Sequence, residues 1–316
     1  MNRNYEFYPK DKENYLKIVP FILTNKYFTL LKAVLNREFD VGLDKYIKES
    51  QRLNEYAYES YIVENKYYRT KYVIKISKDF TYPSINEFSK IIECDYPSIL
   101  KFHGYSPVDF NDEERPAIIV DYFQHSLQDY IFKKDFHKSE TNDYIMILGI
   151  TIGMRYLHKR GIYHNLFCPQ TILIDKNLYP IISEFEVSQR LLDENNQAFY
   201  PEENKIYPYL DPALLDDDGI VLPSSNVYSF SYIIYQIVTK RFHFNRKDGI
   251  RFTLLKKVKR GLRPDISYIE RECVKELITN CWDNDHEKRM TFDEILEYIT
   301  NEKFINDFGD INIYAV

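Results

Sequence analysis

Glycine and cysteine are both scarce in this sequence. Only 9 of the 316 residues are glycine, and none lies between Gly42 and Gly104. The 4 cysteines form no C-x-x-C pair, and no histidine lies at zinc-finger spacing, which argues against a disulfide framework and a structural zinc site. The longest apolar stretch, Tyr144 to Tyr156, is too short and too interrupted to span a bilayer. With no signal-peptide pattern at the amino terminus, we expect a cytoplasmic protein without a membrane span.

An excess of basic residues is also lacking. The net charge is −6, from 42 lysines and arginines against 48 acidic residues, which argues against a general binder of nucleic acid or anionic membranes. A solvated helix face explains the one basic run, which contains Lys256, Lys257, Lys259 and Arg260. With 44% hydrophobic and 28% charged residues, the composition is that of a globular protein with room for one two-lobed domain or two small ones.

Strand patterns come first along the chain and helix patterns follow. The clearest strand is Tyr72–Ile76 within the strand-like stretch 56–76, and Ile99–Tyr105 and Ala117–Tyr122 are further strand candidates. A helix is expected from a Ser84 cap to about Glu93. Later segments predict a long helix at 143–159, a short strand pair at 171–174 and 180–182, and helices at 225–239, 268–282 and 291–299. This order is typical of an α+β fold with segregated lobes.

Eight short segments carry a more specific signal through their order and spacing. Together they resemble the eukaryotic protein kinase domain, closest to its tyrosine-kinase and tyrosine-kinase-like branches. The segments are Tyr72-Val73-Ile74-Lys75, Tyr96-Pro97-Ser98-Ile99, Val120-Asp121-Tyr122-Phe123, Tyr156 to His164, Pro169 to Leu173, Ser183-Glu184-Phe185-Glu186, Asn226 to Ser231, and Cys281 to Phe292.

The resemblance implies a two-lobed kinase-like fold, with a small β-rich lobe carrying one main helix and a larger helical lobe. We expect the domain at 44–300, divided into an amino-terminal lobe 44–123 and a carboxyl-terminal lobe 124–300. Residues 1–43 are expected to be a helical extension, with Asn25 as a possible cap and packing either on the domain or on a partner. Residues 301–316 are expected to form a tail.

Phosphoryl transfer needs phosphates, metal ions and a nucleophile held in place, and the nucleotide positions implied by the resemblance are altered. The segment 49–61, where a glycine-rich phosphate loop belongs, has no glycine. Lys75 and Glu87 match the ion pair that holds the α- and β-phosphates, although they could equally be a structural pair. Val73 replaces a small alanine against the adenine ring, which predicts weak ATP binding at most. The other implied nucleotide-pocket residues are Asp121, Phe123, Leu173 and Glu184.

The implied catalytic loop, His164 to Thr171, has lost its charge-handling groups. Leu166 takes the place of the aspartate that accepts the substrate proton, and leucine has no lone pair for that role. Cys168 replaces the cation beside the transferred phosphate, and Thr171 replaces an asparagine that holds a metal ion. A catalytic role for the Cys168 thiol is disfavoured because no base is evident beside it. Glu184 replaces the metal-binding aspartate with a longer side chain, so Mg²⁺ binding is expected to be poor.

The buried structural residues of the domain, by contrast, are expected to be retained. Asn226 replaces a buried aspartate, and Arg289 has lost its usual glutamate partner, leaving Asp211, the Asp216–Asp218 cluster or solvent as alternatives. Phosphorylation of the segment 184–213 could reorder it, although plain surface tyrosines are the simpler interpretation. The side chains at the four positions that stack in the family's internal spine are Phe102, Ile91, Phe185 and His164.

These replacements predict a pseudokinase, an inactive kinase-fold protein that acts as a signalling scaffold or allosteric module and requires no cofactor. Its expected partners are other signalling proteins. The alternative is a divergent active serine/threonine or tyrosine kinase that transfers the γ-phosphate of ATP to protein, using Glu184 for metal and another base. A different transfer chemistry on the same fold has no support in the sequence.

Overall fold

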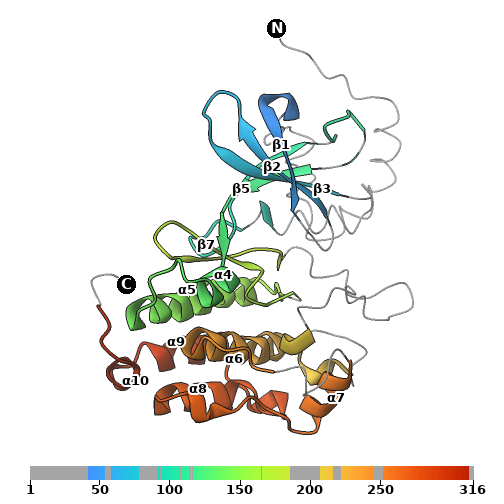
Figure 1. The fold of residues 1–316 in the computed structure, drawn as a ribbon. Coiled ribbons are helices and arrows are strands. Elements are labelled where there is room, and N and C mark those ends of the chain that lie inside the picture. The colour runs from blue at the N-terminus through green and yellow to red at the C-terminus, as the bar shows by residue number, and fades with distance from the viewer. Residues whose placement is uncertain are drawn as a thin grey trace. The chain divides into compact units, whose positions relative to one another are not determined.

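The computed structural model describes residues 42–53, 58–77, 91–92, 94–106, 108–113, 115, 117–164, 166–185, 207–215, 222–244 and 252–312. The chain divides into two compact units (Figure 1). The amino-terminal unit comprises Met1–Cys94 and Lys101–Tyr122, and the carboxyl-terminal unit comprises Asp95–Leu100 and Phe123–Val316. The helix expected within residues 1–41 lies outside the described residues.

The amino-terminal unit contains one five-stranded antiparallel sheet, ordered β1-β2-β3-β5-β4 and preceded by the short helix η1 (Leu43–Lys45). Strands β2 to β5 lie within or overlap the stretches predicted to be strands, whereas β1, which is rich in charged and polar residues, was not predicted. The strands are β1 (Tyr46–Leu53), β2 (Tyr58–Asn65), β3 (Lys71–Ser77), β4 (Phe102–Ser106) and β5 (Ala117–Asp121).

Strand register assigns the side chains to two faces of this sheet, since residues directly opposite each other in a pair share a face. Ser60 lies opposite Lys75 and Ile62 opposite Val73, so these four side chains share one face. The other face carries a buried apolar cluster together with polar residues near its edges. Its buried cluster contains Leu43, Val63, Ile74, Ile76, Ala117 and Ile119.

The carboxyl-terminal unit is mainly helical. Its small sheet has the order β6-β7-β8 and consists of β6 (His125–Ser126), β7 (Ile172–Ile174) and β8 (Pro180–Ile182). Its helices are α4 (Leu127–Phe132), α5 (Glu140–Lys159), α6 (Pro223–Thr239), α7 (Phe252–Lys259), α8 (Glu272–Cys281), α9 (Phe292–Ile299) and α10 (Glu302–Phe308). Together with the strand-rich first unit, this confirms the predicted α+β class.

Local sequence explains where these helices begin and how deeply they lie. The Ser126 and Thr291 side chains cap α4 and α9 in reciprocal capping boxes, and Ser139 caps α5. Helix α6 lies between α5 and α8 (Figure 1). Every residue from Ser225 to Ile237 is buried, as expected for a central helix surrounded by other elements, and its buried polar side chains, such as Asn226 and Gln236, are hydrogen-bonded.

Two segments differ from the expected domain limits. Residues 301–316 were expected to be a tail, yet α10 lies within them and buries Phe304 and Phe308 in the carboxyl-terminal unit. The segment Asp95–Leu100, expected in the first lobe, belongs to the second unit, where Ile99 forms a parallel bridge with Ile182 of β8. In the described part of the chain, no helix is long and apolar enough to cross a membrane.

Candidate functional site

The loop between α5 and β7 contains the positions predicted to correspond to the catalytic residues. Leu166, Phe167 and Cys168 are each 1% exposed, and Thr171 is 2% exposed. Leu166 therefore lies inside the protein, as its apolar side chain requires. This position offers neither a proton acceptor nor an accessible surface at which a substrate hydroxyl could be oriented.

The Thr171 hydroxyl is used within the loop itself. Its Oγ1 lies 2.7 Å from the carbonyl oxygen of Leu166 and 3.0 Å from that of Cys168, and it accepts the Cys168 amide at 3.3 Å. A hydroxyl has one proton to donate, so it serves these two carbonyls as a shared or alternating donor. The side chain at the predicted metal position thus stabilises the loop backbone.

The Cys168 thiol is fully buried in this loop. Burial raises its pKa, which holds the side chain in the protonated thiol form. Because the thiolate is the nucleophilic form of cysteine, this environment gives an inert side chain.

Asn226 of α6 holds the start of the loop. Its Oδ1 accepts the His164 backbone amide at 2.9 Å, and its Nδ2 donates to the His164 carbonyl at 2.7 Å. The same Oδ1 lies 3.1 Å from Nε2 of His158. An aspartate could accept the amide but could not donate to the carbonyl, so the asparagine ties the loop to α6 at both backbone groups.

Glu184, the predicted metal-binding position, follows β8 with φ of 60°. A left-handed backbone is costly for a residue with a Cβ and is retained only where surrounding contacts fix it. The preceding residue supplies such contacts, because the amide and the hydroxyl of Ser183 both donate to the Thr171 carbonyl at 2.9 Å. Among the described residues, no group of three His, Cys, Asp or Glu side chains could hold a metal ion.

Lys75 of β3 lies in the amino-terminal unit and is 2% exposed. Val73 and Tyr58 share its face of the sheet, since Val73 is two residues away on β3 and Tyr58 pairs with Ser77. The Tyr58 ring centroid is 5.8 Å from the Lys75 ammonium, and Tyr58 is itself 1% exposed. A bulky aromatic ring therefore lies near the lysine at the start of β2, within the segment 49–61 where phosphate-binding glycines were expected.

Asp121 ends β5 on the opposite face of this sheet, since it pairs with Tyr72. Its Oδ1 lies 2.5 Å from Nε2 of His103, and the His103 ring meets Tyr72 edge-on. The Asp121 carboxylate is thus engaged on the face that does not carry Lys75.

The remaining predicted residues are placed within their own units or lie outside the described residues. Phe123 and Leu173 belong to the carboxyl-terminal unit, where Leu173 is half-buried between the buried Ile172 and Ile174. Glu87 and Glu186 lie outside the described residues, so the predicted Lys75–Glu87 pair stays a prediction. Of the spine positions, Ile91 and Phe102 lie in the first unit, and His164 and Phe185 are buried in the second with Asn226.

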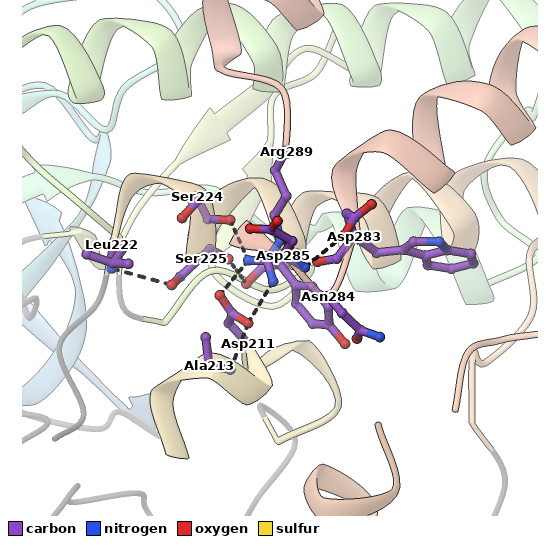
Figure 2. A network of polar contacts seen from close by, with 12 residues as sticks. Asp211, Ala213, Leu222, Ser224, Ser225, Asp283, Asn284, Asp285 and Arg289 are labelled. Atoms are coloured by element: carbon purple, nitrogen blue, oxygen red, sulfur yellow. Dashed lines mark hydrogen bonds and ion pairs between the residues drawn. The ribbon is translucent and has the colours of Figure 1, made fainter. Parts of the chain in front are cut away.

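Arg289 forms a buried ion pair with Asp211 (Figure 2). Both side chains are 0% exposed, and the two guanidinium nitrogens approach the carboxylate at 2.5 and 3.1 Å. The same guanidinium donates to the carbonyls of Ser224 and Asp283, so its charge and its protons are satisfied together. Asp211 is thus the partner among the alternatives left open by the sequence. We call this pair the Arg289 anchor.

A second buried network adjoins the anchor. The Tyr209 hydroxyl donates to Oε1 of Gln236 at 2.7 Å, and Nε2 of Gln236 lies 2.9 Å from Nδ1 of His243. Ser229 of α6 donates to the Tyr209 carbonyl at 2.7 Å. Burial lowers the pKa of His243 to about 3 and raises that of Tyr209, so both side chains are neutral near pH 7. A buried, bonded Tyr209 hydroxyl is a poor phosphorylation site.

The sequence argument missed Tyr58 and His103. Period-two alternation along β2 places Tyr58 on the side of Ser60 and Ile62, so strand parity could have assigned it to the Lys75 face. His103 carried no such signal, because its contact with Asp121 depends on the pairing of β4 with β5 and on a register shift between Phe102 and Gly104.

Comparisons with known proteins agree with this architecture. A family model described as protein tyrosine and serine/threonine kinase matches residues 55–299. Dual specificity protein kinase pyk3 of Dictyostelium discoideum is 27% identical over 249 residues, covering 77% of this chain and 18% of that protein. Ephrin type-A receptor 5 of Rattus norvegicus is 24% identical over 243 residues, covering 75% and 23%.

A further relative is receptor-interacting serine/threonine-protein kinase 1 of Homo sapiens. It is 25% identical over 202 residues, which cover 59% of this chain and 30% of that protein. The chain therefore spans less than a third of the length of each of these relatives.

Proposed function

Because the chain belongs to the family of protein tyrosine and serine/threonine kinases, we propose that it is a pseudokinase, a kinase fold that binds other signalling proteins and does not transfer phosphate. The observation that carries this proposal is the buried Leu166, in a loop whose carbonyls are bonded by Thr171. Loss of a positioned base costs about 10²–10⁴-fold in rate. The cytoplasm, where signalling partners are found, is the proposed location.

We infer that the residues present disfavour Mg·ATP. The Lys75 side chain is buried, with its ammonium 5.8 Å from the centroid of the Tyr58 ring. Val73 adds bulk on the same face, and the Thr171 hydroxyl is already bonded in its own loop. No nucleotide-dependent step is therefore derived, and weak or absent ATP binding is part of the proposal.

A thermal-shift titration with ATP, with and without Mg²⁺, tests the nucleotide part of the proposal. We expect no metal-dependent rise in Tm, since a ligand stabilises only the state that binds it. The matched control variant is Tyr58→Ala, which removes the ring beside Lys75. A rise seen in Tyr58→Ala but not in the wild type would support the ring as the obstacle.

A radiolabelled-ATP transfer assay tests the absence of catalysis. The competing function, a divergent active kinase, is favoured by the retained Lys75 and by the carboxylate of Glu184. Turnover by the wild-type protein that disappears in both Lys75→Met and Glu184→Gln would establish the active enzyme and overturn the pseudokinase proposal. Signal that survives both substitutions would identify a contaminating kinase.

A further inference from the structure

The turn between β2 and β3 exposes two neighbouring tyrosines to solvent. Tyr67 and Tyr68 are 75% and 79% exposed, which are the highest values among the exposed large hydrophobic side chains in the described part of the chain. Of the other tyrosines whose burial is described, only Tyr268 is exposed, at 49%. Both rings belong to one short turn, so their proximity follows from the chain itself and not from the packing of distant elements.

The turn lies beyond the last paired residues of β2 and β3 and is held by a few local hydrogen bonds. Oδ1 of Asn65 accepts the amides of Tyr67 and Tyr68 at 2.9 and 3.1 Å. Arg69 has a left-handed backbone, with φ of 55°, and donates its amide to the Asn65 carbonyl at 2.9 Å. A turn of this kind opens locally at a much smaller free-energy cost than the sheet behind it.

The two phenol hydroxyls differ from those of the other tyrosines in their access. Among the described residues, neither hydroxyl of the turn has a hydrogen-bond partner. The Tyr209 hydroxyl, in contrast, is buried and bonded to α6, and the exposed Tyr268 ring carries the Arg241 guanidinium 4.1 Å from its centroid. An enzyme that modifies a phenol oxygen must reach it, and the turn meets this requirement best.

Basic residues flank the two rings. Lys66 precedes them and Arg69 follows, and no acidic residue lies between Glu64 and Asp79 in the sequence. The Arg69 side chain is 69% exposed, and its Nη1 lies 2.8 Å from Oε1 of Glu64. A phosphate on either ring would carry more negative charge than this carboxylate and three acceptor oxygens, so it would compete with Glu64 for the guanidinium.

We propose that Tyr67 and Tyr68 form a phosphorylation site for a protein tyrosine kinase. The phenol oxygen of one ring attacks the γ-phosphorus of ATP held by that kinase, the bond to the bridging oxygen breaks, ADP leaves, and the phenol proton passes to a base of the kinase. The phosphate then takes the Arg69 guanidinium from Glu64. This inference goes beyond the proposed function, because it holds whether or not the chain itself transfers phosphate.

Phosphorylation of the full chain in vitro tests the proposal. Two purified tyrosine kinase catalytic domains, one from a receptor and one cytoplasmic, are supplied with ATP, and the occupancy of each site is followed by peptide mass spectrometry. A synthetic peptide of residues 62–74 is the fully accessible reference. The turn should react within about tenfold of the peptide rate, since it needs only local opening. Buried Tyr209 and Tyr228 should react at least about 10³-fold more slowly, since they need global unfolding.

Matched variants identify the acceptor. Tyr67→Phe and Tyr68→Phe show which ring carries the phosphate, and the double variant should remove phosphorylation of the turn. The control Tyr268→Phe changes the other exposed tyrosine and should leave the rate at the turn unchanged. Circular dichroism verifies that each variant is folded.

Phosphorus NMR tests the exchange of ion pairs. The second pKa of a phosphotyrosine is ordinarily about 6, and pairing with Arg69 at the surface should lower it to about 5.5. Arg69→Gln should return this pKa to that of the phosphorylated peptide. The control Arg260→Gln replaces an exposed arginine of the other unit and should leave the pKa unchanged.

Three results would overturn the proposal. One is a peptide that neither kinase phosphorylates, and another is a turn that reacts more than about 10³-fold more slowly in the folded chain than in the peptide. The third is a phosphate whose second pKa is the same in the wild type and in Arg69→Gln, which would refute the capture of Arg69.

Discussion

The catalytic-position loop and the Arg289 anchor belong to the same unit, and each contains a position where the resemblance to kinases breaks down. In the loop, Leu166 and Thr171 stand where the resemblance implies polar groups. Both side chains are buried, and the Thr171 hydroxyl bonds the Leu166 carbonyl of the same loop. At the anchor, Asp211-Pro212-Ala213 stands where the resemblance implies Ala-Pro-Glu, so Ala213 lacks the glutamate carboxylate and Asp211 supplies one to Arg289. The buried arginine thus has a carboxylate partner, whereas Leu166 brings no polar group to the loop and the Thr171 hydroxyl is bonded within it.

The largest predicted change in stability concerns the Arg289 anchor. Asp211→Ala leaves the Arg289 charge buried without its carboxylate, which should lower the free energy of unfolding by about 3–5 kcal/mol. Urea denaturation followed by circular dichroism measures the loss. The double variant Asp211→Ala/Ala213→Glu should recover much of it, because the glutamate returns to its family position.

The matched control for the anchor is Lys288→Ala. Lys288 is exposed and pairs with Asp285 on the surface, so its loss should cost at most about 1 kcal/mol. Equal effects of Asp211→Ala and Lys288→Ala would contradict a special role for the buried pair.

An intermediate effect concerns acid stability of the network beside the anchor. The pKa of His243 is about 3 in the folded protein, against an ordinary value of 6.5. Between these values the unfolded chain binds a proton that the folded protein does not, so stability is complete above pH 6.5 and falls as the pH drops toward 3. The fall should approach about 1.4 kcal/mol per pH unit for this one group.

Urea titrations at a series of pH values between these limits measure this slope. His243→Asn should make the slope shallower, although the half-buried His158, whose pKa is also lowered by desolvation, continues to contribute. The control His286→Gln replaces a half-buried histidine outside this buried network. An unchanged slope in His243→Asn would place the acid sensitivity elsewhere.

The smallest predicted change in stability concerns the catalytic-position loop. Thr171→Val keeps the shape of the side chain but removes the hydroxyl that bonds the Leu166 and Cys168 carbonyls, which should destabilise the protein by about 1–2 kcal/mol. Thr279→Val is the control, because its hydroxyl bonds a helix carbonyl on an exposed surface. A neutral Thr171→Val would mean that the loop does not depend on this hydroxyl.

Much of the fold followed from sequence because its signals are local. The alternating apolar residues of β3, the long helix α5 and the buried helix α6 all lie within the predicted ranges or one turn of them. Strand β1 was not predicted, since its Lys-Glu-Ser-Gln-Arg core lacks an apolar alternation and its strand state depends on pairing with β2. The sequence predicts a tail at 301–316, because the contacts that hold α10, the buried Phe304 and Phe308 and the Asp307 carboxylate that accepts the Cys273 amide, depend on the folded chain.

The sequence was sufficient to predict which functional groups are missing from the candidate site. It was less sufficient to predict which residues form contacts in their place. That leucine cannot accept a proton follows from the side chain alone, so Leu166 could be interpreted directly. That Asp211 meets Arg289, 78 positions away, depends on the folded path of the chain, and the sequence left three alternatives. The bonding of Thr171 to its own loop is a matter of backbone geometry and has no periodic signature.

The passage of Asp95–Leu100 through the carboxyl-terminal unit makes the two lobes inseparable as contiguous fragments. The Leu100 amide donates to the Ile182 carbonyl, and the Ile182 amide donates to the Ser98 carbonyl, so this short crossing extends the edge of β8. A truncated protein that begins at Phe123 would lack this segment and uncover both backbone groups of Ile182. Gene fusions and expression fragments that keep these contacts must therefore contain both lobes. If one lobe is exchanged between relatives, the segment Asp95–Leu100 has to move together with the helical unit.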